Sequence, residues 1–397
     1  MPGWLPLLLG FLTAVGPIST DMYLPAFPAI EASLGGAPGT AQITLATWFA
    51  GLAVGQITQG TLSDRFGRRG PLLVGTAIYT IASVGCALAP GLAALSVWRA
   101  VAAFGGSASM VIPRAIVRDL ADGHGAAQLM SRLMLVMGAA PILAPTLGGA
   151  VLGFASWHAI FWIAAAYGVV CLVVVWAWLP DTLPPDQRVR LRLGALVSRY
   201  AAIGRERSFL THVLVGSFAM FGMFAYLGGS PGVFINIYHL EPAIYGMLFG
   251  SCAAGLIAAS QANPRLIRRF GPERVLSTAA YLFLLAGAAL AAVTFAGRAG
   301  LIPVPLAAVY LPIWIAIASC GFIMPNATVG ALSRHAAHAG SASALMGTLQ
   351  FVLGAISGSL VGVLDDGTAR PMALLMLAGG LGAAAADRAR LRTEKKG

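Results

Sequence analysis

The segment GTLSDRFGRR, residues 60–69, is the part of the sequence that decides the fold. It holds one carboxylate and several arginines, and it lies between two apolar stretches, 41–62 and 71–89. A helix that crosses a bilayer needs about 20 apolar residues, so each stretch is long enough to span. A charged loop this short predicts a pair of antiparallel membrane helices.

The composition extends this prediction to the whole chain. Of its 397 residues, 58% are hydrophobic and 10% are charged, whereas a soluble domain carries about 25% charged residues. The chain contains about twelve apolar windows of bilayer length. Their limits are 5–28, 41–62, 71–89, 93–113, 129–153 and 158–179 in the first half, and 209–237, 244–262, 275–296, 304–325, 341–364 and 371–386 in the second. The expected fold is all-α, with twelve transmembrane helices in two pseudo-symmetric six-helix halves.

The formal net charge of +11 reports membrane topology rather than a nucleic-acid partner. Of the 25 basic residues, all but Arg99, Arg298 and Arg370 gather in every second connection between the windows and in the C-terminal tail. Cytoplasmic loops are rich in Lys and Arg. Both termini are therefore expected in the cytoplasm, with the lipid bilayer as a partner and no nucleic acid.

A long polar connection divides the chain into two halves. The three segments are 1–180, the linker 181–208, and 209–397. Within this connection, residues 191–203 could form an amphipathic helix on the cytoplasmic surface. The halves also resemble each other, because Phe66-Gly67 after the second window matches Phe270-Gly271 after the eighth. Such a parallel repeat suggests a transporter that works by alternating access.

Several classes of enzyme find no support in the residues. Both lysines, Lys395 and Lys396, lie in the tail, so the sequence has no G-x-x-x-x-G-K-[ST] phosphate-binding loop. The four cysteines lie far apart in apolar stretches, without metal-ligand spacing. Residues 228–232, GGSPG, satisfy the G-x-S-x-G pattern, but they lie in an apolar window instead of a strand-to-helix turn. We expect no enzyme activity, no cofactor and no metal site.

The segment GTLSDRFGRR resembles the signature loop of the major facilitator superfamily, G-x-L-x-D-R-x-G-R-R. The matching residues are Gly60, Leu62, Asp64, Arg65, Gly67, Arg68 and Arg69. In that family Asp64 would meet the positive end of a neighbouring helix, and the basic residues would pair with acids such as Asp119. The resemblance implies a conformational latch of the outward-facing state. The alternative is an ordinary basic loop.

Two further segments resemble a narrower branch of that superfamily, the drug:proton antiporters of the bicyclomycin-resistance and chloramphenicol-efflux type (Bcr/CflA). They are STDMYLPAFPAI, residues 19–30, and FAYLGGSPGVFINIYHLEP, residues 224–242. The resemblance implies proton-coupled multidrug efflux across the bacterial inner membrane by a monomer. It makes Asp21 the membrane-embedded acid of the first helix.

The position of Asp21 supports that role on physical grounds. The stretch from Leu5 to Val15 is too short to cross a bilayer, so the first helix must run past Asp21. No other carboxylate lies as deep inside a predicted span. A desolvated carboxyl group favours its protonated form, so it could carry a proton inward or bind a cationic drug when charged. The alternative is a locally hydrogen-bonded Asp21, because Pro25 and Pro28 signal an irregular helix end.

Arg99 is the basic residue that lies well inside a predicted span, the window 93–113. A charge at the centre of a membrane helix costs about 2.5–3.5 kcal/mol on insertion scales. Arg99 resembles the intramembrane arginine of the family, which implies a part in proton relay beside Asp21. The alternative is that its side chain snorkels to the outer interface.

The fifth window contains GAAPILAPTLGG, which resembles the glycine-rich antiporter motif of the superfamily. Pro145, Gly148 and Gly149 fit that motif, whereas Ala140 and Ala144 stand where glycines are expected. Small residues let helices approach each other closely, and prolines can kink them. The alternative is a generic small-residue helix face.

Flexible methionines and aromatic rings suit a cavity that accepts varied ligands. The candidate lining residues are Tyr23, Met110, Met134, Met137, Tyr226, Met324, Asn326 and Gln350. The expected partners are protons and small amphiphilic drugs, such as bicyclomycin- or chloramphenicol-like compounds. The rival hypotheses are a facilitator of the same fold that moves one metabolite by symport or uniport, and a membrane enzyme or sensor.

Overall fold

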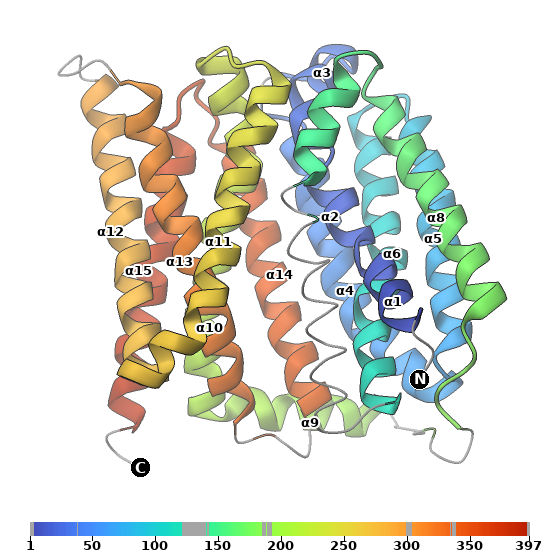
Figure 1. The fold of residues 1–397 in the computed structure, drawn as a ribbon. Helices are drawn as coiled ribbons and strands as arrows, with labels where there is room; N and C mark the ends of the chain where they lie inside the picture. The colour runs from blue at the N-terminus through green and yellow to red at the C-terminus, as the bar shows by residue number, and fades with distance from the viewer. Residues whose placement is uncertain are drawn as a thin grey trace. The chain divides into compact units, whose positions relative to one another are not determined.

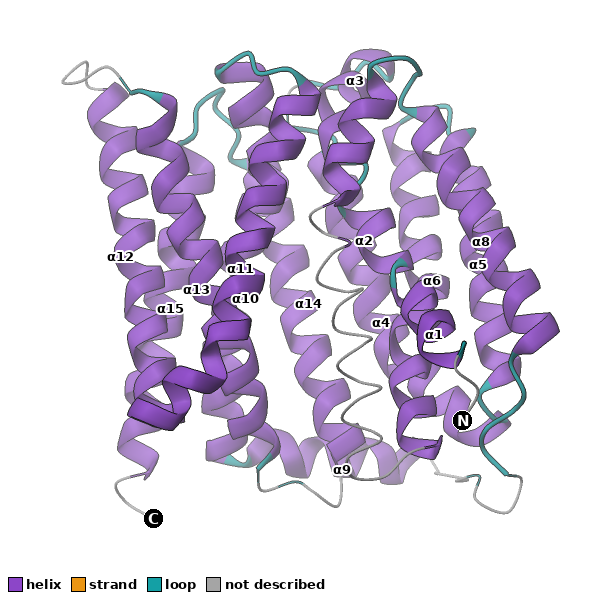
Figure 2. Cartoon of the chain, viewed as in Figure 1, coloured by secondary structure: helices purple, strands orange, loops and turns teal. Residues whose placement is uncertain are grey.

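The computed structural model describes residues 4–37, 39–120, 140, 143–184, 188, 193–298, 304–333, 335 and 339–394. Every regular element among these residues is helical (Figure 2), so the all-α prediction is confirmed. The described residues form two compact units. The first lies within 1–37, 47–192 and 241–247, and the second within 38–46, 193–240 and 248–397.

Figure 1 shows the helices described in the first half of the chain, which lie at the predicted windows 5–28, 41–62, 71–89, 93–113 and 158–179. These helices are α1 (Leu5–Thr13), α2 (Val15–Thr20), the 3-10 helix η1 (Leu24–Ala26), α3 (Phe27–Ser33), α4 (Gln42–Phe66), α5 (Arg69–Ala87), α6 (Leu92–Leu120) and α8 (His158–Trp178). Of the fifth window, the structure describes residue 140 and residues 143–153, which include a short apolar helix, Leu143–Leu152.

The second half supplies the remaining spans and one crosswise helix. Its elements are α9 (Leu193–Arg205), α10 (Arg207–Pro231), the π-helix η3 (Gly232–Ile237), α11 (Pro242–Phe270), α12 (Pro272–Arg298), α13 (Leu306–Leu332), α14 (Ala339–Val363) and α15 (Arg370–Glu394). The helix α9 largely overlaps residues 191–203, where the sequence predicts a helix. It runs across the ends of α10 and α14 and contacts both (Figure 1).

The two units share one pattern of helix packing. In the first, α5 packs against α6 and α8, and the α1–α2 segment packs against the same two helices. In the second, α12 packs against α13 and α15, and α10 packs against that same pair. The turns before α5 and α12 also match, because Gly67 and Gly271 both adopt positive φ, +89° and +82°. The repeat noticed in the sequence is therefore a repeat in structure.

Ten helical segments of the described chain are long and apolar enough to cross a membrane. Helix α4 has sufficient length, 25 residues, but its composition is more polar because it carries Gln42, Thr44, Gln59 and Ser63. All four side chains are buried, so they face protein rather than lipid. Together with the short helix of the fifth window, these segments account for the expected multi-pass membrane fold.

The last helix extends beyond its predicted limits. The window 371–386 stops where charged residues begin, whereas α15 continues to Glu394. Asp387 and Arg390 have side chains that are 0% and 1% exposed, with Arg390 Nη2 donating to Asp387 Oδ1 at 2.8 Å. The same nitrogen donates to Ser277 Oγ of α12 at 3.1 Å. Because the two charges neutralise each other inside the unit, they do not end the helix.

Candidate functional site

The first span is broken at Asp21. In a continuous α-helix the N–H of residue 25 would bond the carbonyl of residue 21, but Pro25 has no N–H. The N–H of Leu24 donates to that carbonyl instead, at 3.3 Å, and the chain passes into the 3-10 helix η1. The irregularity expected from the prolines is therefore present, and it falls directly after Asp21.

Asp21 lies inside the protein at this break. It is 7% exposed, and its carboxylate has no hydrogen bond or ion pair with other residues in the described part of the chain. The hydrogen bonds required by the local-capping alternative are thus not found there. A buried carboxylate of this kind is stabilised only when a proton or a cation neutralises it.

Glycines of the fifth window lie against neighbouring backbone in the first unit. A Cβ added to Gly148 would come 1.8 Å from Met22 O, in the residue that follows Asp21. A Cβ on Gly149 would come 2.5 Å from Pro242 O, and Pro145 O lies 2.8 Å from the Cβ position of Gly246. Only glycine lets the backbone at position 148 come this close to Met22 O. The glycine-rich motif of the fifth window therefore packs against the segment that follows Asp21.

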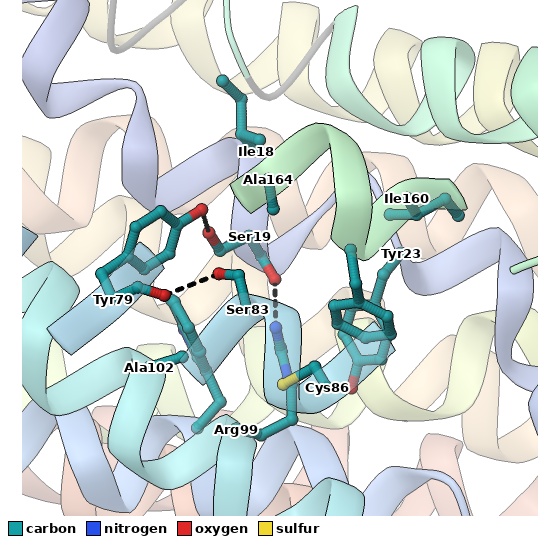
Figure 3. Close-up of a pocket in the computed structure, with 12 residues that line it drawn as sticks. Ile18, Ser19, Tyr23, Tyr79, Ser83, Cys86, Arg99, Ala102, Ile160 and Ala164 are labelled. Atoms are coloured by element: carbon teal, nitrogen blue, oxygen red, sulfur yellow. Dashed lines mark hydrogen bonds between the residues drawn. The ribbon is translucent and has the colours of Figure 1, made fainter. Parts of the chain in front are cut away.

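Arg99 reaches from α6 to the carbonyl end of α2. Its Nη1 donates to Ser19 O at 2.6 Å (Figure 3), and its guanidinium lies over the rings of Tyr23 and Trp48, 4.1 and 4.3 Å from their centroids. The residue is 2% exposed, so its side chain does not snorkel to an interface. Cation–π contacts and a helix carbonyl stabilise its charge.

Arg99 and Asp21 therefore act on the same segment without forming an ion pair with each other. Arg99 holds the carbonyl of Ser19, two residues before Asp21. The hydroxyl of Ser19 in turn bonds Tyr79 OH at 2.6 Å. Sequence reasoning missed Trp48 and Tyr79. In an apolar window, an aromatic residue that stacks on a cation cannot be told from one that only packs in the core.

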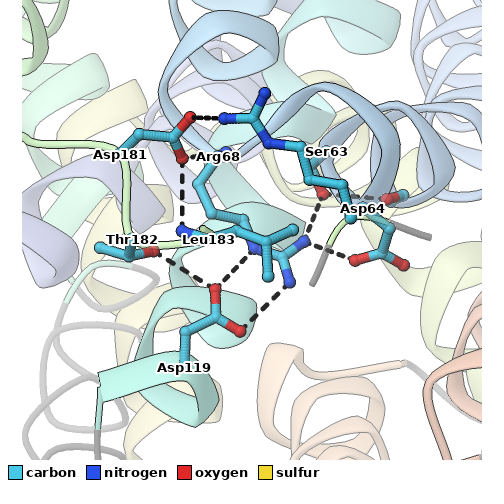
Figure 4. A network of polar contacts seen from close by, with 9 residues as sticks. Ser63, Asp64, Arg68, Asp119, Asp181, Thr182 and Leu183 are labelled. Atoms are coloured by element: carbon cyan, nitrogen blue, oxygen red, sulfur yellow. Dashed lines mark hydrogen bonds and ion pairs between the residues drawn. The ribbon is translucent and has the colours of Figure 1, made fainter. Parts of the chain in front are cut away.

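Arg68 is the centre of the signature loop. Its Nε donates to Asp119 Oδ2 at 2.7 Å and its Nη2 to Asp119 Oδ1 at 3.2 Å, while Nη1 donates to Asp64 and Ser63 (Figure 4). Burial alone would lower the pKa of Arg68, but the hydrogen bonds and charges of Asp119 and Asp64 outweigh burial and raise that pKa above its usual value. The guanidinium therefore stays charged.

The segment after α8 completes this network. The backbone N–H of Arg68 donates to Asp181 Oδ1 at 2.7 Å, and Arg188 Nη2 donates to Asp181 Oδ2 at 2.9 Å. Gly67 is required at the turn, because a Cβ there would come 2.0 Å from Asp181 Oδ2 and its φ is +89°. Sequence reasoning missed Asp181, whose available signal was an acid placed directly after a span on the arginine-rich side.

The other residues of the loop have separate surroundings. Arg69 Nη2 donates to Trp176 O at 2.6 Å, and Arg65 lies over the ring of Phe66. Gly60 has ordinary space around it, with Val111 Cγ1 3.7 Å from its Cβ position. Within the described part of the chain, Arg68 thus binds both Asp64 and Asp119. In that part, Arg65, Arg69 and Gly60 lie outside this network.

The candidate lining residues divide between the units. In the first, Tyr23 stacks on Arg99, and Met110 Cε lies 3.2 Å from the Cβ position of Gly16 on α2. Met134 and Met137 lie outside the described residues. Tyr23 and Met110 therefore border the segment that carries Asp21.

In the second unit, Tyr226 is buried and stacks on Phe249 with ring centroids 5.4 Å apart. Asn326 is also buried and donates to Asn263 Oδ1 at 2.9 Å. The remaining candidates are Met324, half-buried on α13, and Gln350, which packs on Gly216 of α10. Tyr226 and Asn326 join helices within this unit.

Comparison with known proteins gives a consistent result. The sequence matches the Major Facilitator Superfamily over residues 9–359. It is 35% identical to an uncharacterized MFS-type transporter, YdgK, of Bacillus subtilis (strain 168), over 94% of this chain and 91% of that protein. It is 31% identical to a bicyclomycin resistance protein homolog of Haemophilus influenzae, over 93% of this chain and 92% of that protein. The crystal structure of a D-xylose-proton symporter shares the fold, with a TM-score of 0.74 and 14% identity over 97% of this chain and 95% of that one.

Proposed function

Because the chain belongs to the Major Facilitator Superfamily and is a transporter rather than an enzyme, we propose that it exports small amphiphilic drugs in exchange for protons. Support for a drug as cargo comes from its similarity to a bicyclomycin resistance protein homolog along almost the whole chain. Support for proton exchange comes from Asp21, a buried carboxylate without a protein partner in the described chain, at the break in the first span.

At Asp21, a proton and a cationic drug would compete for the same carboxylate oxygens. A buried negative charge is costly unless something neutralises it, so the site favours one of the two ligands over an empty charged form. Each proton that enters the cell gains about 2.3 kcal/mol per 100 mV of membrane potential. Exchange at one site would therefore couple proton entry to drug exit.

Arg99 would act on this site through the backbone. It holds the carbonyl of Ser19 at the end of α2, where a cation also interacts favourably with the helix dipole. We assign Arg99 to positioning the end of α2, directly before Asp21.

The Arg68 network would form the rigid part of a conformational latch. It ties the turn after α4 to the end of α6 and to the segment after α8, all within the first unit. The side chain of Asp64 is 47% exposed even though it accepts from Arg68, so it keeps surface available to meet a further helix end. We place this basic side in the cytoplasm of a bacterium, with the chain in the inner membrane as a monomer.

The proposal is tested by dye extrusion from bacterial cells that lack their own efflux pumps. Wild-type protein should extrude a fluorescent cationic dye in a protonophore-sensitive way, and Asp21→Asn at equal membrane abundance should not. Glu241→Gln is the matched control, because Glu241 is an exposed carboxylate, and it should extrude normally. Protonophore-sensitive extrusion by Asp21→Asn would refute the role of Asp21, whereas gradient-driven dye uptake by wild type would favour the symport alternative.

A further inference from the structure

A small cavity lies beside Arg99 in the first unit (Figure 3). The polar and aromatic side chains that line it include Ser19, Tyr23, Trp48, Tyr79, Ser83 and Arg99. Its space suits roughly one water-sized molecule or ion. Asp21 is not among the lining residues, so the cavity does not include the carboxylate proposed to exchange proton and drug.

Two residues that line this cavity carry three hydrogen-bond donors with no acceptor among the described residues. They are Nε and Nη2 of Arg99 and the indole Nε1 of Trp48. Both side chains are almost completely buried, with 2% of Arg99 and 1% of Trp48 exposed. Guanidinium and indole N–H groups can only donate. The ligand that satisfies them must therefore be an acceptor.

The hydroxyl groups nearby are already engaged. Tyr79 OH bonds Ser19 Oγ at 2.6 Å, and Ser83 Oγ donates to Tyr79 O at 2.8 Å. None of these hydroxyl groups accepts a hydrogen bond from the three donors of Arg99 and Trp48, and Arg99 is the one charged residue among the described residues that line the cavity. Arg99 forms no ion pair within the described chain, and a buried charge without a counter-charge is strongly destabilising.

We propose that this cavity binds one small inorganic anion, held by Arg99 and by the indole N–H of Trp48. The anion would neutralise Arg99 and satisfy its two orphan nitrogens, so that Asp21 need not serve as the counter-ion. This inference concerns a resident ion and does not depend on which cargo is transported.

The proposal is tested by thermal unfolding of purified protein in detergent, in chloride or gluconate at equal ionic strength. A ligand that binds the native state raises the unfolding midpoint in proportion to the logarithm of its concentration above Kd. Wild type should therefore melt higher in chloride than in gluconate. Trp48→Phe keeps a ring over Arg99 but removes the N–H, and the apparent chloride affinity should fall about tenfold.

Two variants separate this site from general salt effects and from Asp21. Trp314→Phe removes an indole that donates to Ser251 O at 3.0 Å in the second unit, and it should keep the full chloride response. Asp21→Asn should also keep the response. Equal midpoints of wild type in chloride and gluconate would overturn the proposal, as would a chloride response of Trp48→Phe equal to that of Trp314→Phe.

Crystals of the wild type grown in bromide provide a measurement that does not depend on a variant that folds. An anomalous peak within hydrogen-bond distance of Arg99 Nη2 and Trp48 Nε1 is expected. No peak there at saturating bromide would overturn the proposal.

Discussion

The pair formed by Arg68 and Asp119 should show strong energetic coupling. The perturbations are Arg68→Lys, which keeps the charge but cannot bind both carboxylate oxygens, and Asp119→Asn, which removes the negative charge. The double variant closes a mutant cycle. The structure predicts that these two residues act as one unit, because Arg68 contacts both oxygens of Asp119 at 2.7 and 3.2 Å and is buried.

The expected magnitude follows from these contacts. A hydrogen bond to a charged group contributes about 1.5–3 kcal/mol, so each single variant should lose about 2 kcal/mol of the free energy of unfolding. Once either Arg68 or Asp119 is replaced, their mutual contacts are already weakened, so replacing the second residue costs little further stability. The double variant should therefore be less destabilised than the sum of the single variants by at least about 1 kcal/mol.

The assay is equilibrium unfolding in mixed detergent micelles, with Arg370 and Asp366 as the control pair. That ion pair is more exposed, and exposed pairs contribute about 0.2–1 kcal/mol, so its cycle should show weak coupling. Additive effects of Arg68→Lys and Asp119→Asn, within about 0.5 kcal/mol, would refute the interpretation of the Arg68 network as a unit.

Four further substitutions test close packing, backbone conformation and buried charge. Gly148→Ala should abolish dye extrusion, because its Cβ would meet Met22 O at 1.8 Å, whereas Gly60→Ala should extrude normally because its nearest neighbour would be 3.7 Å away. Gly67→Ala should lose about 1–2 kcal/mol of unfolding free energy from its left-handed conformation alone, measured in mixed micelles, and a wild-type value would contradict the required positive φ. Arg390→Ala leaves the Asp387 carboxylate buried without its partner and should lose about 3–5 kcal/mol in the same assay; a loss under about 1 kcal/mol would contradict the buried pair.

Charge and hydropathy were sufficient to predict the architecture. A bilayer demands long apolar helices with charged connections, so the expected spans correspond closely to the helices of the described chain. The prolines after Asp21 likewise predicted the break, because a missing N–H acts locally. Features governed by neighbours in the chain could be predicted from the sequence.

Features that depend on contacts between residues far apart in the chain could not be predicted from the sequence. The extension of α15 past Asp387 depends on the pairing with Arg390 and on Ser277 in another helix, and the sequence alone shows only charges that resemble a span end. The contact of Asp181 with Arg68 joins residues 113 positions apart. The orphan donor of Trp48 is visible only once α4 packs beside Arg99.

Competition between a proton and a drug at Asp21 is tested most directly by measuring proton release on drug binding. Purified protein in weakly buffered detergent solution is mixed with a cationic drug while the pH is recorded, and drug binding is followed separately by equilibrium dialysis. Wild type should release protons as the drug binds, and Asp21→Asn should release none. Equal proton release by Asp21→Asn, or stoichiometric drug binding to wild type with no proton release at any pH where the protein is folded, would contradict the exchange mechanism.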